Sequence, residues 1–168
     1  ASPSATAAQP RNLKPEDYAG LRDVDEPKLS PDGNLVVYVV KTADMEKDKI
    51  AGNLWLAKWD GSENRALTHG NNDQSHPRWS PDGKFIAFLK PYKDTRNIWV
   101  KGVGEPFSAA KLITSDTKRP IPGYFWSRDG KFILFVQDQG GDENFNVYAV
   151  NPSAPAGPGS DVPAARNI

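Results

Sequence analysis

The sequence predicts an all-β fold: a partial β-propeller of about three four-stranded antiparallel blades, preceded by a short amino-terminal helix. One run of ten residues around Ser-x-Asp-Gly occurs three times, at 29–38, 79–88 and 126–135, with spacings of 50 and 47 residues. No helical pattern of ten or more residues lies between the apolar runs, which argues against alternating β-α-β units. Repeats of about 40–50 residues that each hold four short strands are typical of propeller blades.

Composition and charge exclude several functions. The chain has 168 residues with 15 Pro and 14 Gly, as expected of a globular protein rich in turns. Lys+Arg and Asp+Glu are both 21, so no single-sign field favours nucleic acid or an anionic membrane. There is no Cys, which excludes disulfides, thiolate zinc sites and cysteine nucleophiles. We therefore expect no nucleic-acid partner, no membrane partner and no cofactor.

The amino-terminal segment divides into two parts. Residues 1–12 are expected to be a disordered leader, because residues 1–9 are small and uncharged, as after removal of a signal peptide. This favours a periplasmic or secreted protein, although a merely frayed or vector-derived terminus explains the same composition. Residues 13–23 are expected to form a short helix, since Pro15 precedes two acidic residues that suit a first helical turn.

Residues 24–168 are expected to form the blades. The blades are assigned to about 24–68, 75–114 and 120–168. Each Ser-x-Asp-Gly predicts a tight turn between the first two strands of its blade. The runs after these turns are Leu35–Val40, Phe85–Leu89 and Phe132–Val136. They are apolar on both alternating faces, which predicts strands covered on both sides.

Two further elements recur in the same order. An Asn-apolar-aromatic-apolar segment occupies 53–56, 97–100 and 146–149, and a Leu-Thr or Ile-Thr segment closes 65–68 and 111–114. The Pro- and Gly-rich stretch 151–165 is expected to connect the last two strands of blade three. The last four residues match the closing segment without its Thr. We therefore expect an incomplete propeller, the amino-terminal part of a longer polypeptide left by proteolysis, truncation or incomplete tracing.

These residues resemble a known family. The segments 13–18, 21–24 and 27–33 are similar to the start of the propeller in serine peptidases of the prolyl oligopeptidase family, in particular the acylaminoacyl-peptidase and dipeptidyl-peptidase-like branches. Gln137-Asp138 with Gly140–Asn144 resembles a loop of that family's third blade. The resemblance covers about 13–168. The Ser-Pro-Asp-Gly blades are also similar to the propeller of the periplasmic TolB protein.

The resemblance implies a propeller that caps an α/β-hydrolase domain and admits short peptides. In that family the Ser, Asp and His of the triad lie in the hydrolase domain, which is absent here, and the sequence contains no G-x-S-x-G. We therefore assign no catalytic, cofactor-binding or substrate-binding residue and expect this piece to be inactive. The implied partners are the remainder of the polypeptide and short peptide substrates. The alternatives are a noncatalytic TolB-like protein-binding scaffold and a sensor or glycan-binding propeller.

Three groups of residues are candidate sites. His69 and His76 flank Asn71, Asn72 and Asp73, but a metal site needs at least three converging ligands, and a polar loop between blades is favoured.

The second group, Asp138, Asp142 and Glu143, could bind a cation or an ammonium group. It lacks the spacing of a calcium loop, so a solvated hairpin turning at Gly140-Gly141 is favoured. The amine-binding Glu pair of the dipeptidyl branch has no match that we could place residue by residue.

The third group is aromatic: Trp55, Trp99, Tyr148, Trp79 and Trp126. Their recurrence at the blade period favours core packing over stacking on a sugar or base, because a ligand contact need not repeat. Leu29 stands where two of these tryptophans stand, which suggests that blade one packs differently or sits beside the closing blade.

Overall fold

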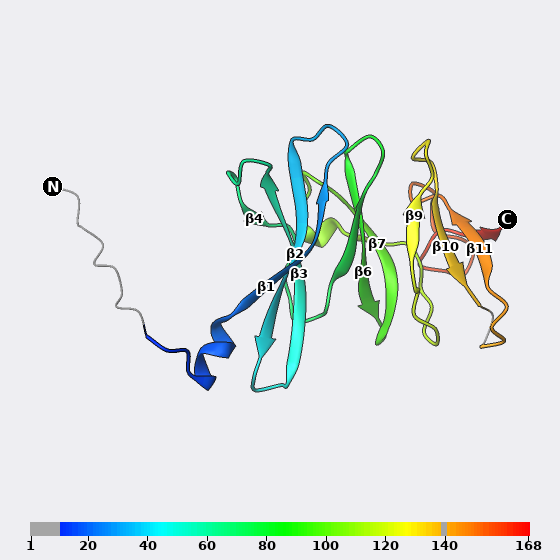
Figure 1. Ribbon diagram of the computed structural model, residues 1–168. Coiled ribbons are helices and arrows are strands. Elements are labelled where there is room, and N and C mark those ends of the chain that lie inside the picture. The colour runs from blue at the N-terminus through cyan, green and yellow to red at the C-terminus, as the bar shows by residue number, and fades with distance from the viewer. Residues whose placement is uncertain (1–10, 139–140) are drawn as a thin grey trace.

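A computed structural model describes residues 11–138 and 141–168. These residues form three four-stranded antiparallel sheets, which stand side by side in chain order (Figure 1). The prediction of an all-β fold with three four-stranded blades is confirmed. Residues 1–10 of the expected leader lie outside the described residues, as do Gln139 and Gly140 of the expected hairpin.

Within each blade the strands pair in chain order, so that the first and fourth strands are the two edges. Blade one contains β1 (Arg22–Leu29), β2 (Leu35–Asp44), β3 (Lys49–Lys58) and β4 (Arg65–Ala66). Blade two contains β5 (Ser75–Trp79), β6 (Phe85–Tyr92), β7 (Thr95–Gly102) and β8 (Lys111–Leu112). Blade three contains β9 (Tyr124–Trp126), β10 (Ile133–Gln137), β11 (Asn146–Val150) and β12 (Ala165–Asn167).

The helix expected over residues 13–23 is shorter and of another type. It is a single 3-10 helix, η1 (Pro15–Gly20), and the chain pairs with β2 from Arg22 onward. So short a segment does not repay the cost of nucleating an α-helix. Its start is fixed instead by Asp17, whose carboxylate accepts the Lys14 N–H at 2.7 Å. Among the described residues, no helix is long and apolar enough to span a membrane.

The three Ser-x-Asp-Gly turns share one hydrogen-bond pattern. In blade two the Ser80 hydroxyl donates to the Asp82 carboxylate at 2.6 Å and accepts the Phe85 N–H at 2.9 Å. The same carboxylate oxygen accepts the Lys84 N–H at 3.1 Å. Gly83 has a φ of 71°, in the left-handed region that favours glycine. The turn therefore closes the β5–β6 hairpin with side chains that recur in all three blades.

Neighbouring turns also touch. A Cβ atom on Gly83 would lie 3.7 Å from Pro31, and one on Gly130 would lie 3.6 Å from Pro81, so each Pro packs against the Gly of the next blade. On the outer side of the blades, Arg65 of β4 donates to the Val103 carbonyl at 3.5 Å. The equivalent cation in blade two, Lys111, donates to two carbonyls of blade three. Successive blades are thus joined at both their turns and their outer edges.

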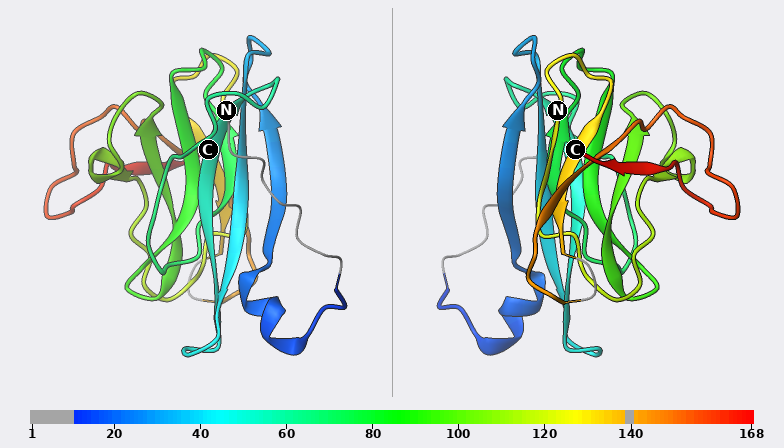
Figure 2. Two further views of the ribbon diagram at one scale, coloured as in Figure 1. Left: turned by 90° about the vertical axis from the view of Figure 1, so that its left-hand side faces the viewer. Right: turned by 90° about the vertical axis from the view of Figure 1, so that its right-hand side faces the viewer.

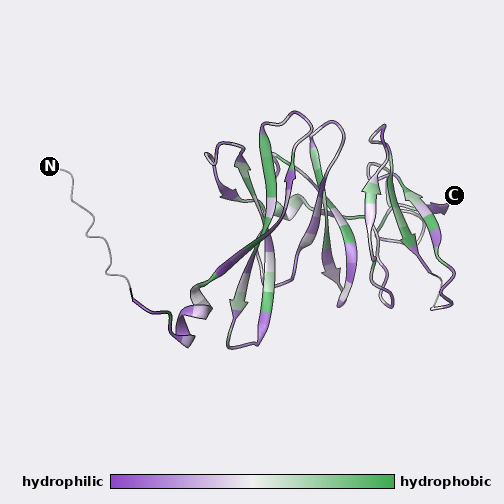
Figure 3. Cartoon of the chain, viewed as in Figure 1, coloured by the Kyte–Doolittle hydropathy of each residue, from purple (hydrophilic) through white to green (hydrophobic). Residues whose placement is uncertain are grey.

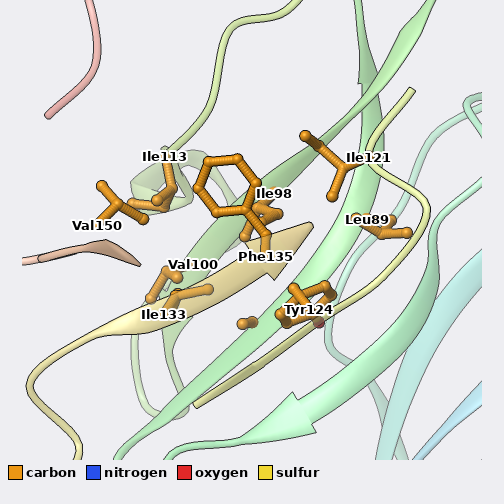
Figure 4. Close-up of a cluster of buried hydrophobic side chains, with 10 residues drawn as sticks. Leu89, Ile98, Val100, Ile113, Ile121, Tyr124, Ile133, Phe135 and Val150 are labelled. Atoms are coloured by element: carbon orange, nitrogen blue, oxygen red, sulfur yellow. The ribbon is translucent and has the colours of Figure 1, made fainter. Parts of the chain in front are cut away.

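The hydrophobic core lies between blades. Ile86 and Phe88 of β6 pack against blade one, whereas Ala87 and Leu89 pack against blade three, and all four side chains are fully buried. Figure 4 shows the second of these clusters, where side chains of β6, β7, β9 and β10 converge. Apolar residues follow the strands in Figure 3, as this arrangement requires.

Of the three strands that follow the turns, β6 is buried on both faces from Ile86 to Leu89, although Phe85 is exposed. In β2 and β10 one face is buried, while Val36, Tyr38, Leu134 and Val136 on the other face are half-buried and only Val40 there is buried. The reason is geometric, because a blade covers both its faces only when it has a neighbour on each side, and blade two is the middle one of the described three.

Two connections on the outer side of the blades differ in length. Residues 103–110 join β7 to β8 and contain the 3-10 helix η2 (Phe107–Ala109). Residues 151–164 join β11 to β12, which confirms that this Pro- and Gly-rich stretch connects two strands of one blade. Figure 2 shows both connections on the same side of the molecule, in lime green and in orange to red.

The Gly83→Ala variant tests the turn. The new side chain meets only ordinary contact distances, so its cost is conformational, and we expect the free energy of unfolding to fall by about 1–2 kcal/mol. Gly104→Ala is the control, since Gly104 has no positive φ and nothing within 4 Å of a Cβ; it should change stability by less than about 0.5 kcal/mol. Urea unfolding measures both, and equal losses would contradict the turn's requirement for glycine.

The Asp82 carboxyl provides a pH test. Its pKa lies below the ordinary 3.8, because the Ser80 hydroxyl and then the Lys84 N–H donate to the ionised form. A lowered pKa stabilises the fold above the ordinary value, and this stabilisation is lost as pH falls below about 4. In a carboxyl NMR titration, Ser80→Ala should raise the pKa of Asp82 and leave those of Asp32 and Asp129 unchanged. A parallel rise in all three would show a global effect instead.

Candidate functional site at the inner edge of the blades

The first strands of the three blades form one continuous inner edge. β1, β5 and β9 are edge strands, and β5 contacts both of the others. An edge strand presents unpaired N–H and C=O groups that need partners. In a propeller these strands surround the central channel, so the groups that satisfy this edge also shape any passage through the blades.

Two of the inner strands carry a bulge at the same place. The ladder register shifts between Asp25 and Lys28 in β1, and between Ser75 and Arg78 in β5. Glu26 and His76 occupy these bulges with φ values of 52° and 55°, and each precedes a proline. A positive φ is uncommon for a residue other than glycine and costs of order 1–3 kcal/mol. Both conformations must therefore be held by specific contacts. The Glu26 N–H donates to the Asp25 carboxylate of the same strand at 2.8 Å.

The contacts that hold His76 come from the neighbouring blades. The His76 N–H donates to the Glu26 carboxylate of blade one, and the His76 carbonyl accepts the Tyr124 hydroxyl of blade three at 2.5 Å. The imidazole Nδ1 lies 3.5 Å from a Glu26 oxygen. Tyr124 is almost fully buried, and burial raises the pKa of its phenol well above 10.0. This inner-edge cluster of Glu26, His76 and Tyr124 joins all three blades through the backbone of one residue, His76.

The two histidines do not share a site. The His69 ring packs edge-on against Phe107, with ring centroids 5.0 Å apart, while His76 belongs to the inner-edge cluster. In the described part of the chain, no group of three or more His, Asp or Glu side chains could hold a metal ion.

Two tryptophans, Trp79 and Trp126, also join the inner strands of neighbouring blades. The Trp79 indole N–H donates to the Lys28 carbonyl of β1 at 2.9 Å, and the Trp126 indole N–H donates to the Arg78 carbonyl of β5 at 3.3 Å. Each bond runs from one blade to the blade before it. Leu29, which stands where these tryptophans stand, cannot donate and is 59% exposed. Blade one therefore differs from the others at this edge, as the sequence suggested.

Core packing of the recurrent aromatic residues is confirmed for four of the five. Trp79 and Trp99 pack against the cluster between blades one and two, and Trp126 and Tyr148 against that between blades two and three. Tyr148 also stacks on Phe135, with centroids 5.4 Å apart.

The acidic residues near the expected hairpin are separated. Asp138 is buried and accepts from the Arg119 guanidinium at 2.7 Å. Asp142 and Glu143 are exposed, and the Asp142 carboxylate accepts the Asn144 N–H at 3.0 Å. The buried Asp138 is thus set apart from the two exposed carboxylates, and it holds Arg119 of the segment that links blades two and three.

Sequence reasoning missed Glu26 and Tyr124. The sequence does contain a signal for Glu26, because Glu26-Pro27 in blade one and His76-Pro77 in blade two occupy equivalent positions. The first pair lies just before Leu29 and the second just before Trp79, and these two residues are equivalent in the repeat. Tyr124 gave no such signal, because its partner is the backbone of a residue 48 positions away.

The chain is similar in sequence to known peptidases. It is 33% identical over 117 residues to dipeptidyl aminopeptidase BIII of Pseudoxanthomonas mexicana, which covers 70% of this chain and 16% of that protein. It is 30% identical over 132 residues to the uncharacterized peptidase YuxL of Bacillus subtilis, covering 78% of this chain and 20% of that one. The chain belongs to the propeller region of the prolyl oligopeptidase family. It spans a fifth or less of the length of these two relatives. No protein-family model matches it.

Solved structures support the fold of this prolyl oligopeptidase family propeller. The acylaminoacyl peptidase of Pyrococcus horikoshii aligns with a TM-score of 0.66 at 19% identity, over 90% of this chain and 26% of that one. The propeller domain of the Pyrococcus furiosus trilobed protease gives 0.65 at 21%, over 89% and 44%. A putative TolB of Agrobacterium tumefaciens gives 0.57 at 20%, over 83% and 46%. At these identities the likeness concerns the fold alone.

Tyr124→Phe tests the inner-edge cluster. Removing the hydroxyl leaves the His76 carbonyl without this donor, so the free energy of unfolding should fall by about 1–3 kcal/mol. Tyr38→Phe is the matched control, because its hydroxyl donates to Asn64 at an exposed site, and it should cost less than about 0.5 kcal/mol. Chemical denaturation measures both. An equal, small loss in the two variants would show that the bond from Tyr124 does not hold the bulge.

Proposed function

We propose that this chain is the substrate-gating propeller part of a serine peptidase that hydrolyses short peptides through an acyl-enzyme. The observation that carries the proposal is the 33% identity over 117 residues to a dipeptidyl aminopeptidase. The second relative is also named a peptidase. Because the chain spans a small part of both relatives, the activity belongs to the protein that contains the chain.

The reaction needs groups that this chain does not supply. An acyl-enzyme mechanism requires a serine hydroxyl, a histidine that takes its proton, a carboxylate that orients the histidine, and donors for the oxyanion. In hydrolases of the α/β type the serine stands in a G-x-S-x-G turn, and this sequence has none. We assign catalysis to a hydrolase domain elsewhere in the polypeptide.

The proposed contribution of the blades is to limit access. The inner strands are tied to one another by the inner-edge cluster and by the indoles of Trp79 and Trp126. Such bonds oppose separation of the blades, so a peptide would have to fit the passage that the inner edge leaves. This restriction favours short, flexible peptides over folded proteins as substrates.

A noncatalytic TolB-like scaffold is the second candidate. The observation that favours it is the fold likeness to a putative TolB. The two candidates differ in the rest of the reading frame, because only a peptidase needs about 250 further residues that carry G-x-S-x-G followed by Asp and His.

A periplasmic or secreted location is part of the proposal. It is supported by the small, uncharged residues 1–9. Fractionation of cells that express the natural gene tests it, and a protein confined to the cytoplasm would overturn it.

A fluorophosphonate probe tests the proposed activity. We expect the full-length protein to be labelled on one serine outside residues 1–168 and to lose peptidase activity in step with labelling. Mass spectrometry of the labelled peptide locates the serine. Labelling within residues 1–168 would contradict the placement of the nucleophile. A full-length protein that neither reacts with the probe nor cleaves di- to tetrapeptides would favour the scaffold.

A further inference from the structure

Blade one, at one end of the row of three blades, exposes apolar side chains on the face that no other described blade covers (Figure 1). Val24 and Leu29 of β1 are 62% and 59% exposed, and Trp59, the residue that follows β3, is 72% exposed. In the β1–β2 ladder, Val24 and Leu29 stand opposite Val40 and Val36, on the face of the sheet that is turned away from blade two. Single exposed apolar residues are normal, but a group of them on one face marks an interaction surface.

The repeat shows which residues of the other blades are equivalent to Trp59. The Trp59 N–H donates to the Asn34 carbonyl at 3.1 Å, and the Val103 N–H donates to the Lys84 carbonyl at 3.0 Å. Asn34 and Lys84 each follow the Asp-Gly of their turn. Trp59 and Val103 also lie four positions after the tryptophan of their third strand, and thus on the same side of the sheet as that tryptophan. By the same count, the equivalent residue of blade three is Pro152.

In blade two the equivalent face is covered by the blade before it. Trp79, Trp99 and Val103 pack against the apolar cluster between blades one and two, where Ile86 and Phe88 of β6 are fully buried. The same face of blade three packs against blade two. In both of these blades the face that corresponds to the exposed one of blade one is therefore an interface with the preceding blade.

Blade one needs a whole blade to cover this face, and not a single strand. Its four strands follow one another in the chain and pair in that order, as in the other two blades. No strand is thus missing that another part of the polypeptide would have to supply. The chain spans a fifth or less of the length of two of its relatives. The remainder of such a polypeptide is long enough to contain further blades.

The described blades also show what the preceding blade presents at this position. Its outer strand carries a cation, and this cation donates to a carbonyl of the next blade. Arg65 donates to the Val103 carbonyl at 3.5 Å, and Lys111 donates to the Pro152 carbonyl at 3.0 Å. Both acceptors are the residues equivalent to Trp59. A cation at the same place on a covering blade would therefore reach the Trp59 carbonyl and lie beside the indole, whose face attracts a cation.

The inner edge of blade one lacks the aromatic contact that the other blades make there. Trp79 and Trp126 donate their indole N–H groups to the preceding blade, whereas Leu29 stands at the equivalent position and has no such group. At the outer side the difference is reversed, because blade one has Trp59 where blade two has the smaller Val103. The large aromatic side chain that faces the preceding blade thus lies at the outer side in blade one.

We propose that the face of blade one formed by Val24, Leu29 and Trp59 packs against a further blade of the same polypeptide, the last blade of its propeller, and that Trp59 anchors this joint. The covering blade presents apolar side chains to this face and a lysine or arginine of its outer strand to the Trp59 carbonyl and ring. The propeller is then closed by contact between two complete blades. This joint requires a longer polypeptide but no peptidase activity, so loss of the one and loss of the other are separate results.

Photo-cross-linking in the full-length protein tests which segment covers Trp59. With p-benzoylphenylalanine in place of Trp59, we expect irradiation to join residue 59 to a residue outside 1–168 of the same molecule, in the outer strand of a blade and near a lysine or arginine. The same replacement at Met45, an exposed residue beyond the opposite end of β3, should not give this product. Mass spectrometry locates the cross-link. A product that joins two copies of the chain, a product with a segment outside the propeller, or no product at residue 59 would overturn the proposal.

The thermal stability of the full-length protein gives a second test. If Trp59 is buried in the joint, Trp59→Ala should lower the midpoint of thermal unfolding by about 5 °C or more, because a large buried ring is lost. If Trp59 stays exposed, the same change should shift the midpoint by less than about 1 °C. Met45→Ala is the control and should fall within that smaller limit. A shift in Trp59→Ala no larger than that in Met45→Ala would also overturn the proposal.

Discussion

Blades one and two each depend on the next blade to satisfy the open edge of their first strand. Strands β1 and β5 each leave backbone carbonyls without a ladder partner, and side chains of the next blade donate to them. The donors are Trp79, Trp126 and Tyr124. An unpaired edge invites association with other chains, and a buried unpaired carbonyl costs stability. Pairing these edges across blades removes both problems, and it also fixes the order and spacing of the blades.

The strained bulges follow from this arrangement. His76 could not hold a positive φ before a proline unless its N–H and carbonyl were both engaged, and Glu26 and Tyr124 engage them from opposite sides. The bulge in turn frees this N–H and carbonyl from the ladder of blade two. The strained backbone of His76 and the hydrogen bonds that join the three blades therefore depend on each other. The apolar clusters between the blades supply the remaining cohesion, because no blade buries both faces alone.

The sequence predicted the features that repeat. The turns, the four strands of each blade and the packing of four recurrent aromatics all have local patterns that recur at the blade period. It did not predict contacts between a side chain and the backbone of another blade, such as the one from Glu26 to His76, since nothing local marks the acceptor 50 residues away. The short helix expected over residues 13–23 is a 3-10 helix over Pro15–Gly20, and it ends earlier than expected because Arg22 and Asp23 pair with β2 instead of extending it.

A residue that differs from its equivalents in the other blades is therefore more informative than one that recurs, because packing between blades does not explain it. A residue that packs one blade on the next must recur, so Arg65 and Lys111 need no further explanation. Lys101 is different, because burying a charge is costly and the equivalent residues, Ala57 and Val150, show that the blade packs without it. Its ammonium donates to the carbonyls of Gly102 and Glu105, so it holds the start of the 103–110 connection against the end of β7. Lys101 therefore serves the connection that is particular to blade two, and not the packing of one blade on the next.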